Sequence, residues 1–285
     1  MNWLTEHKIP LGAAMEEFVD WLTLHASGLF DAISGSLEWL ILNLVTLMQW
    51  FPPIVPILAT AAIAWFWHRS LAMVIFVTCA LLLILNLGYW QEMLETFVLV
   101  LAATLLCVLI GIPLGIMAAH KPWLYTLLRP ILDLMQTIPT FVYLIPTLVL
   151  FGLGVVPGLI STIIFAIAAP IRLTYLGISS VPEELMEAGK AFGATPSKLL
   201  LKVELPAAMP QIMAGITQCI MLSLSMVVIA ALVGADGLGK PVVRALNTVN
   251  ISQGFEAGLA IVLVAVILDR LCKAPSRRAT KRKAG

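Results

Sequence analysis

A glycine-rich run near the end of the chain, Gly234-Ala-Asp-Gly-Leu-Gly239-Lys240, comes near to a nucleotide-binding motif. In the phosphate-binding loop of ATPases, the lysine is followed by Ser or Thr, whose hydroxyl holds the magnesium ion. Pro241 occupies that position here and has no hydroxyl. We therefore expect no ATPase site in this run, and we expect its glycines to form a tight turn.

The sequence contains no motif for a metal site or for a hydrolase. His7, His25, His68 and His120 are scattered and do not have metal-ligand spacing. Neither an H-E-x-x-H motif nor a Ser/His arrangement typical of a hydrolase occurs. We therefore predict no metal site and no catalytic residue, so the chain is not expected to be an enzyme.

The composition indicates whether this chain folds in water or in a lipid bilayer. Hydrophobic residues make up 60% of its 285 residues and charged residues 12%, with a mean hydropathy of +1.00. Soluble domains are closer to about 45–50% apolar and about 25% charged. Phe97–Ala119 and Met135–Ile171 contain no charge at all. These values exclude a soluble enzyme, a disordered chain and a disulfide scaffold.

The apolar runs predict an all-α, polytopic helical membrane protein with about seven transmembrane helices. The first run is so short that it either tilts little or pairs with the second as a hairpin. All four cysteines lie in or beside apolar runs, so we expect no disulfides. The predicted spans are residues 53–67, 70–88, 95–118, 133–153, 157–178, 208–233 and 255–273.

Residues 1–52, which precede these spans, carry six acids and one base. We predict an acidic extracytoplasmic extension, and Glu6 argues against a secretory signal because such signals begin with a basic region. Apolar residues recur there every three or four positions, which favours amphipathic helices lying on the membrane surface over a loosely ordered extension. These residues are Phe18, Trp21, Leu22, Phe30, Ile33, Leu37 and Leu40.

The distribution of basic residues predicts the orientation of the chain in the membrane. If the N-terminus is outside and the C-terminus cytoplasmic, fourteen of the 17 Lys and Arg residues fall inside. Only Lys8, Lys240 and Arg244 then lie outside. Residues 274–285 become a basic cytoplasmic tail.

The hydrophilic loop at residues 180–206 predicts two short cytoplasmic helices joined by a sharp turn. Ser180 and Glu183 fit a capping box, and Thr195-Pro196 fits the start of the second helix. Gly193 fits the position that ends the first helix. Leu185, Gly189 and Phe192 form an apolar stripe suited to a groove on a partner protein, although an interfacial connector resting on lipid is an alternative reading.

This loop resembles the EAA loop of ABC importer permeases. Glu187-Ala188-Gly189 is followed after three residues by Gly193, and after nine more by Val203-Glu204-Leu205-Pro206. The family pattern has Ala where Gly189 stands and Ile where Val203 stands. Two further segments, Met135 to Pro146 and Leu222 to Gly239, resemble the permeases of osmoprotectant importers for glycine betaine, proline betaine and choline. The resemblance covers roughly residues 90–273.

The resemblance implies the compact (type I) importer permease fold over residues 53–273, in a bacterial inner membrane. It also implies a second copy of the chain, an extracytoplasmic binding protein and an ABC ATPase bound at the coupling loop. ATP and magnesium would then be held by the ATPase, and this chain would bind no cofactor and no nucleic acid. Phe192 would be the apolar anchor, Gly193 the turn and Glu187 a polar contact. Ala188 and Gly189 complete the motif, and Leu205-Pro206 would couple the loop to the next span.

A pathway for a quaternary ammonium requires aromatic faces and weak dipoles, because this group cannot donate a hydrogen bond. Ordinary helix packing explains each candidate equally well. Arg172, a charge within a predicted span, is expected to snorkel to the cytoplasmic face, and Gly111 and Gly115 to form a packing notch. The pathway candidates are Gln136, Thr137, Phe141, Tyr143, Gln218, Ser223, Ser225 and Met226.

Three other functions compete with this interpretation. The chain would also fit an ABC permease for another small solute, such as an amino acid. An ion-coupled secondary transporter or channel is less favoured, because such proteins often bury charged side chains near the bilayer centre and no midplane acid is evident. An intramembrane hydrolase is disfavoured by the missing motifs.

Overall fold

A computed structural model describes residues 11–273, and every regular element within that range is a helix, which confirms the all-α class. The predicted basic tail and the first ten residues lie outside the described range. The helices are α2 (Leu11–Gln49), α3 (Ile54–His68), α4 (Leu71–Asn86), α5 (Trp90–His120), α6 (Pro122–Thr137), α7 (Thr140–Phe151), α8 (Val155–Ala166), α9 (Ala168–Ser179), α10 (Glu183–Ala191), α11 (Pro196–Leu199), the π-helical turn η1 (Leu200–Glu204), α12 (Leu205–Ala231), α13 (Gly239–Asn247) and α14 (Ile251–Cys272).

The number of spans differs from the prediction of seven. Within residues 11–273, five helical segments are long and apolar enough to cross a membrane, or six if one bent pair counts as a span. Four of the predicted spans, those at 95–118, 157–178, 208–233 and 255–273, fall on such segments. The five segments are Gly12–Gln49, Trp90–His120, Val155–Ser179, Pro196–Ala231 and Ile251–Cys272.

The span predicted at residues 133–153 is not one straight helix. α6 and α7 meet at an angle of 98° across a short break. Ile138 is extended there, with φ −64° and ψ 132°, because the residue before a proline is pushed out of the helical region by Pro139. The Tyr143 hydroxyl donates to the Met135 carbonyl at 2.5 Å and so satisfies the end of α6 at the bend.

The two predicted spans at 53–67 and 70–88 form a hairpin of short helices. α3 has 15 residues and α4 has 16, so each is only about 22–24 Å long against about 30 Å of bilayer hydrocarbon. Arg69 joins them in the left-handed conformation, with φ 46°. Neither helix reaches the length of a single span, which is one reason that the count falls below seven.

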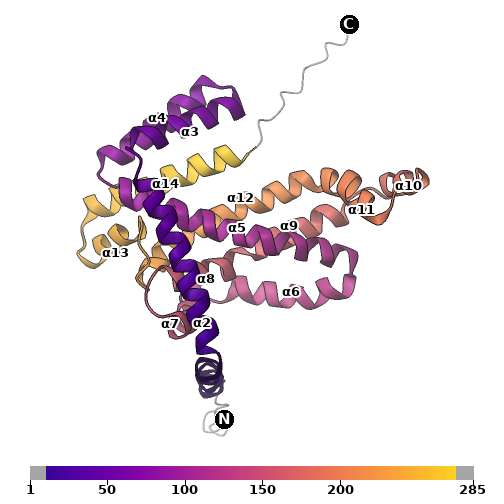
Figure 1. Cartoon of the computed structure of the whole chain (residues 1–285), viewed down its shortest axis with the longest axis horizontal. Coiled ribbons are helices and arrows are strands. Elements are labelled where there is room, and N and C mark those ends of the chain that lie inside the picture. Colours follow the sequence, from indigo (N-terminus) through magenta and orange to yellow (C-terminus); the bar gives the residue numbers. More distant parts are fainter. Residues whose placement is uncertain (1–10, 274–285) are drawn as a thin grey trace, which may run out of the picture.

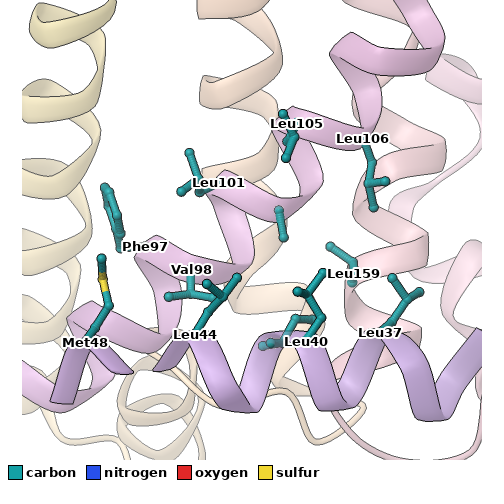
Figure 2. A pocket seen from close by; sticks show the side chains of 12 residues that line it. Leu37, Leu40, Leu44, Met48, Phe97, Val98, Leu101, Leu105, Leu106 and Leu159 are labelled. Atoms are coloured by element: carbon teal, nitrogen blue, oxygen red, sulfur yellow. The ribbon is translucent and has the colours of Figure 1, made fainter. Parts of the chain in front are cut away.

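The N-terminal stretch, for which amphipathic helices on the membrane surface were predicted, forms one continuous 39-residue helix, α2. Its placement on the membrane surface stays a prediction. α2 lies at a steep angle to α5 and α8 and does not run parallel to them (Figure 1). Its apolar side chains line a cavity of about 140 Å³ against α5, where Met48 lies near Phe97 and Leu37 toward Leu106 (Figure 2). The apolar spacing is therefore explained only in part by contact with the bundle: Leu37 and Leu40 line this cavity and Phe30 packs on Phe151, whereas Phe18 and Trp21 are 55% exposed.

The centre of the bundle is built from α5, α9 and α12, which lie along the long axis of the molecule (Figure 1). A Cβ atom added to Gly115 of α5 would come within 2.7 Å of the Ile171 carbonyl oxygen and of the Thr174 Cβ on α9. One added to Gly111 would come within 3.0 Å of Pro170. These contacts confirm the packing notch predicted for Gly111 and Gly115, and they hold the two helices close together.

Candidate functional site

The coupling segment, residues 180–206, projects from one end of the molecule, whereas α13 lies at the opposite end (Figure 1). Within this segment, α10 ends at Ala191 and Gly193 has φ +72°, the left-handed conformation expected of a helix-ending glycine. The Gly193 amide donates to the Lys190 carbonyl at 2.9 Å. α11 then begins at Pro196, directly after Thr195, as the sequence indicates.

The capping box predicted at Ser180 and Glu183 is wrong. The Ser180 hydroxyl donates backward to the Gly177 carbonyl at 3.1 Å and so belongs to the end of α9. Pro182 is the residue that precedes α10, and no side chain caps that helix. The reason is that α9 continues to Ser179, which leaves Ser180 in its final turn and unable to serve the next helix.

The predicted apolar stripe is interrupted at its centre. Phe192 is 93% exposed and Leu185 is 49% exposed, so both side chains are available to a partner. Gly189 instead faces α11, where an added Cβ would approach Leu199 Cδ2 at 2.5 Å. The glycine at this position of the motif thus lets α10 pack closely on α11, while exposed Glu187 and Ala188 stay on the surface.

Leu205 and Pro206 join the coupling segment to α12 without a break in the helix. The Leu205 amide bonds to the Leu200 carbonyl, five residues back, which makes the π-helical turn η1. Pro206, directly after this turn, has no amide to donate to the preceding helical turn, and a π turn is one way of accommodating that loss. α11, η1 and α12 therefore form one helical segment, Pro196–Ala231.

An interaction that sequence reasoning missed links this segment to α5. Glu204, the last residue of η1, is 5% exposed, and its Oε2 accepts a hydrogen bond of 2.8 Å from His120 Nε2. His120 is the last residue of α5, 84 positions earlier in the chain. The sequence did contain a sign of this pair, because Glu204 is flanked by the apolar residues Val203 and Leu205. A carboxylate that is buried among apolar side chains needs a partner.

A second ion pair gives Arg172 a role that the sequence did not indicate. Its guanidinium donates to Asp133 Oδ1 at 2.6 Å, which joins α9 to α6. The rings of Tyr125 and Tyr175 stack between the same two helices at a centroid distance of 3.5 Å. Arg172 is therefore fixed to a neighbouring helix by a specific partner, where the sequence indicated only snorkelling.

The eight pathway candidates lie in three different surroundings. Gln136 and Thr137 end α6, and Phe141 and Tyr143 lie just beyond the bend, with Tyr143 bonded to the Met135 carbonyl. On α12, Met226 and Ser223 are fully buried, whereas Gln218 and Ser225 are exposed. Gln218 lines a groove of about 410 Å³ beside the end of α14. Their role in a pathway stays a prediction.

The glycine-rich run forms the tight turn expected of it, with φ +95° at Gly234 and +123° at Gly237. The turn packs on the start of α5, where the Leu238 amide donates to the buried Thr96 hydroxyl at 2.8 Å. A Cβ atom at Gly237 would come within 2.6 Å of that hydroxyl. The glycine-rich run therefore packs directly against Thr96.

A polar cavity of about 270 Å³ lies beside this turn, at the end remote from the coupling segment. Lys240 and Arg244 line it together with the acids Glu92, Glu95 and Asp236, and Lys240 pairs with Asp236. Burial raises the pKa of Tyr89 at its edge, and the carboxylates of Glu256 and Glu92 raise it further, so the phenol stays protonated.

Apolar helices long enough to cross a bilayer, together with a helix pair that projects from one end and exposes Phe192, define an integral membrane protein. Residues 111–281 match the family of binding-protein-dependent transport system inner membrane components, and the chain belongs to this family. It is a bacterial inner membrane protein with the helical fold of ABC importer permeases.

Relatives of known name lie close to this chain. It is 46% identical to the glycine betaine transport system permease protein OpuAB of Bacillus subtilis, over 93% of each chain. It is 46% identical to the glycine betaine/proline betaine permease ProW of Escherichia coli, over 83% of this chain and 66% of ProW. Among solved structures, an inward-facing methionine ABC transporter, MetNI, matches with a TM-score of 0.55 at 25% identity, over 61% of this chain and 88% of that one.

Proposed function

We propose that this chain is the permease subunit of an ATP-driven, binding-protein-dependent importer of glycine betaine, proline betaine and related osmoprotectants such as choline. The observation that carries this proposal is the 46% identity to a glycine betaine permease over 93% of both chains. The segments 135–146 and 222–239, which resemble those of osmoprotectant permeases, lie at the α6–α7 bend and at the end of α12.

Transport would proceed by alternating access, driven by two ATPase subunits bound to two copies of this chain. Phe192 is the anchor in the ATPase groove, because it is the most exposed large apolar side chain of the coupling segment. Exposed Glu187 adds a polar contact at the rim of that groove. Since Pro196–Ala231 is one helical segment, a displacement of the docked helices is carried directly into α12.

ATP and magnesium would be held by the partner ATPase. Pro241 supplies no hydroxyl for the magnesium ion, and the glycine run packs on Thr96 at the end opposite the coupling segment. This division of labour makes the present chain a transport subunit and not an enzyme.

With the N-terminus outside and the C-terminus in the cytoplasm, in agreement with the bias in basic residues, the crossings would be made by α5, the α6–α7 pair, α8–α9, Pro196–Ala231 and α14. α2 and the α3–α4 hairpin would then stay on the outer side. The coupling segment is then cytoplasmic, and α13 faces the binding protein at the outer surface. Lys240 and Arg244 would contact acidic side chains of that protein, and Arg244 is the more available because Lys240 already pairs with Asp236.

Reconstituted uptake tests this proposal. The chain is placed in liposomes with the ATPase and binding protein that co-purify with it, and uptake of labelled glycine betaine, choline and methionine is measured. We expect uptake of glycine betaine only when ATP is on the ATPase side and the binding protein is on the other. Proton-driven uptake by the chain alone would identify a secondary transporter, and uptake of methionine in place of glycine betaine would identify an amino acid permease.

A further inference from the structure

Glu204 is an acid that the helix packing buries almost completely. Its side chain is 6% exposed, whereas that of His120, its partner, is 46% exposed. A buried carboxylate is costly unless another group pairs with it, and the 2.8 Å bond from His120 Nε2 provides that pairing. The bond therefore holds Glu204 against α5 in a defined geometry.

The position of Glu204 places this bond at the junction between the coupling segment and the bundle. η1 packs against α10, α11 and α12, so Glu204 lies where the docking helices meet the long helix of the bundle. The surroundings of the bond are apolar, because side chains of α5 and of this region pack against one cluster of Ile178, Ala208 and Ile212; they are Ile112, Ile116 and Ala119 of α5 together with Leu200 and Leu205. Apolar contacts are not directional, whereas a hydrogen bond in a low-dielectric site fixes one registry.

α5 is also held firmly at its other end. The buried hydroxyl of Thr96 accepts the Leu238 amide, and Gly237 lies directly against Thr96. α5 is a single helix of 31 residues and therefore connects the coupling segment with the turn at residues 234–239 near the polar cavity. Along its length, Gly115 keeps it in close contact with α9.

We propose that the His120–Glu204 hydrogen bond fastens the coupling segment to α5, so that movement of the docked helices is transmitted along α5 to the outer turn as well as into α12. This inference rests on the proposed function. His120 and Glu204 are positioning residues in this mechanism, and they contact neither substrate nor nucleotide. Without the bond, the coupling segment would move α12 while α5 followed only by apolar contact.

Proteoliposomes that report uptake and ATP hydrolysis together test this coupling. In His120→Ala, we expect the amount of glycine betaine taken up per ATP hydrolysed to fall about tenfold, as loss of a hydrogen bond to a charged group implies. ATP hydrolysis itself should stay near the wild-type rate, because the ATPase site is on the partner. His120→Gln, which keeps a donor, should recover most of the ratio.

Lys121→Ala is the matched control, because it removes an exposed base directly after His120 and outside the coupling segment. This variant should keep the wild-type ratio. A ratio unchanged in His120→Ala would overturn the inference, as would uptake and hydrolysis that fall together in proportion to the amount of chain in the membrane.

A double-variant comparison covers the case in which His120→Ala fails to fold. His120→Leu, Glu204→Leu and the double variant are compared, because a leucine at either position cannot form the bond, and a working pair requires that the double variant be no worse than the poorer single one. Losses that multiply would show that the two residues act independently. Absence of ATP-dependent uptake by the wild-type chain would count against the proposed function, whereas normal wild-type coupling with insensitive variants would count against this inference alone.

Discussion

Gly193 reverses the chain between α10 and α11, directly after the exposed Phe192. Its φ of +72° lies in the left-handed region, which costs an ordinary L-residue about 1–2 kcal/mol and a β-branched residue more. No heavy atom lies within 4 Å of a Cβ built on Gly193, so backbone conformation is the constraint there. The orientation of α10, with Phe192 at its end, relative to α11 therefore depends on the turn at Gly193.

Replacement of Gly193 by Val should lower ATP-driven uptake by about tenfold or more, since left-handed strain of this size displaces Phe192 from the ATPase groove. Gly193→Asn is the matched control, because Asn tolerates the left-handed region and should retain most of the uptake. The measurement is the initial rate of labelled glycine betaine uptake, normalised to the amount of chain. Wild-type uptake in Gly193→Val would refute the role of this turn in coupling.

At the scale of helices, the close approach of α5 and α9 is what holds the centre of the bundle together. Gly115 lies against the backbone of Ile171 and against Thr174, and backbone atoms cannot move aside as the tip of a side chain can. The coupling proposed for α5 requires this contact, since a helix that slides over its neighbour transmits little movement.

Gly115→Leu should destabilise the folded chain by about 1–3 kcal/mol, the usual cost of overpacking a filled interface. Gly258→Leu on α14 is the control, because nothing lies within 4 Å of a Cβ at that position. Thermal unfolding in detergent, followed by the loss of monodisperse protein, measures the difference. Equal midpoints for the two variants would show that α5 and α9 do not depend on this contact.

At the scale of the whole molecule, the two ends of the long axis have different chemistry. One end bears α10 and the exposed Phe192, while the other bears α13 and the polar cavity with its acids and bases (Figure 1). A subunit driven by an ATPase on one side and loaded by a binding protein on the other requires such a separation.

A photo-crosslinking amino acid at position 192 should capture the ATPase in native vesicles and leave the binding protein unlabelled. The same group at position 246, where Leu246 of α13 is 76% exposed, should capture the binding protein and leave the ATPase unlabelled. Immunoblots against both partners distinguish the products. Capture of the binding protein from position 192 would reverse the proposed orientation.

Much of this fold was readable from the sequence, because length and hydropathy are local properties of a segment. The spans at 95–118, 157–178, 208–233 and 255–273, the turn at Gly193 and the start of α11 at Pro196 all follow from neighbouring residues. The prediction of about seven spans exceeds the five or six segments that are long and apolar enough to cross, because hydropathy does not distinguish a short hairpin from two crossings, or a bent pair from one helix.

The sequence by itself showed that the chain folds in a membrane, that it is helical, and which motif the coupling segment carries. Each of these depends on residues adjacent in the chain. Only the tertiary structure decided that α2 packs across the bundle, that Arg172 pairs with Asp133 and that His120 bonds to buried Glu204. The physical reason is that these partners are 39 and 84 positions apart in the chain, and only the packing of separate helices brings such residues together.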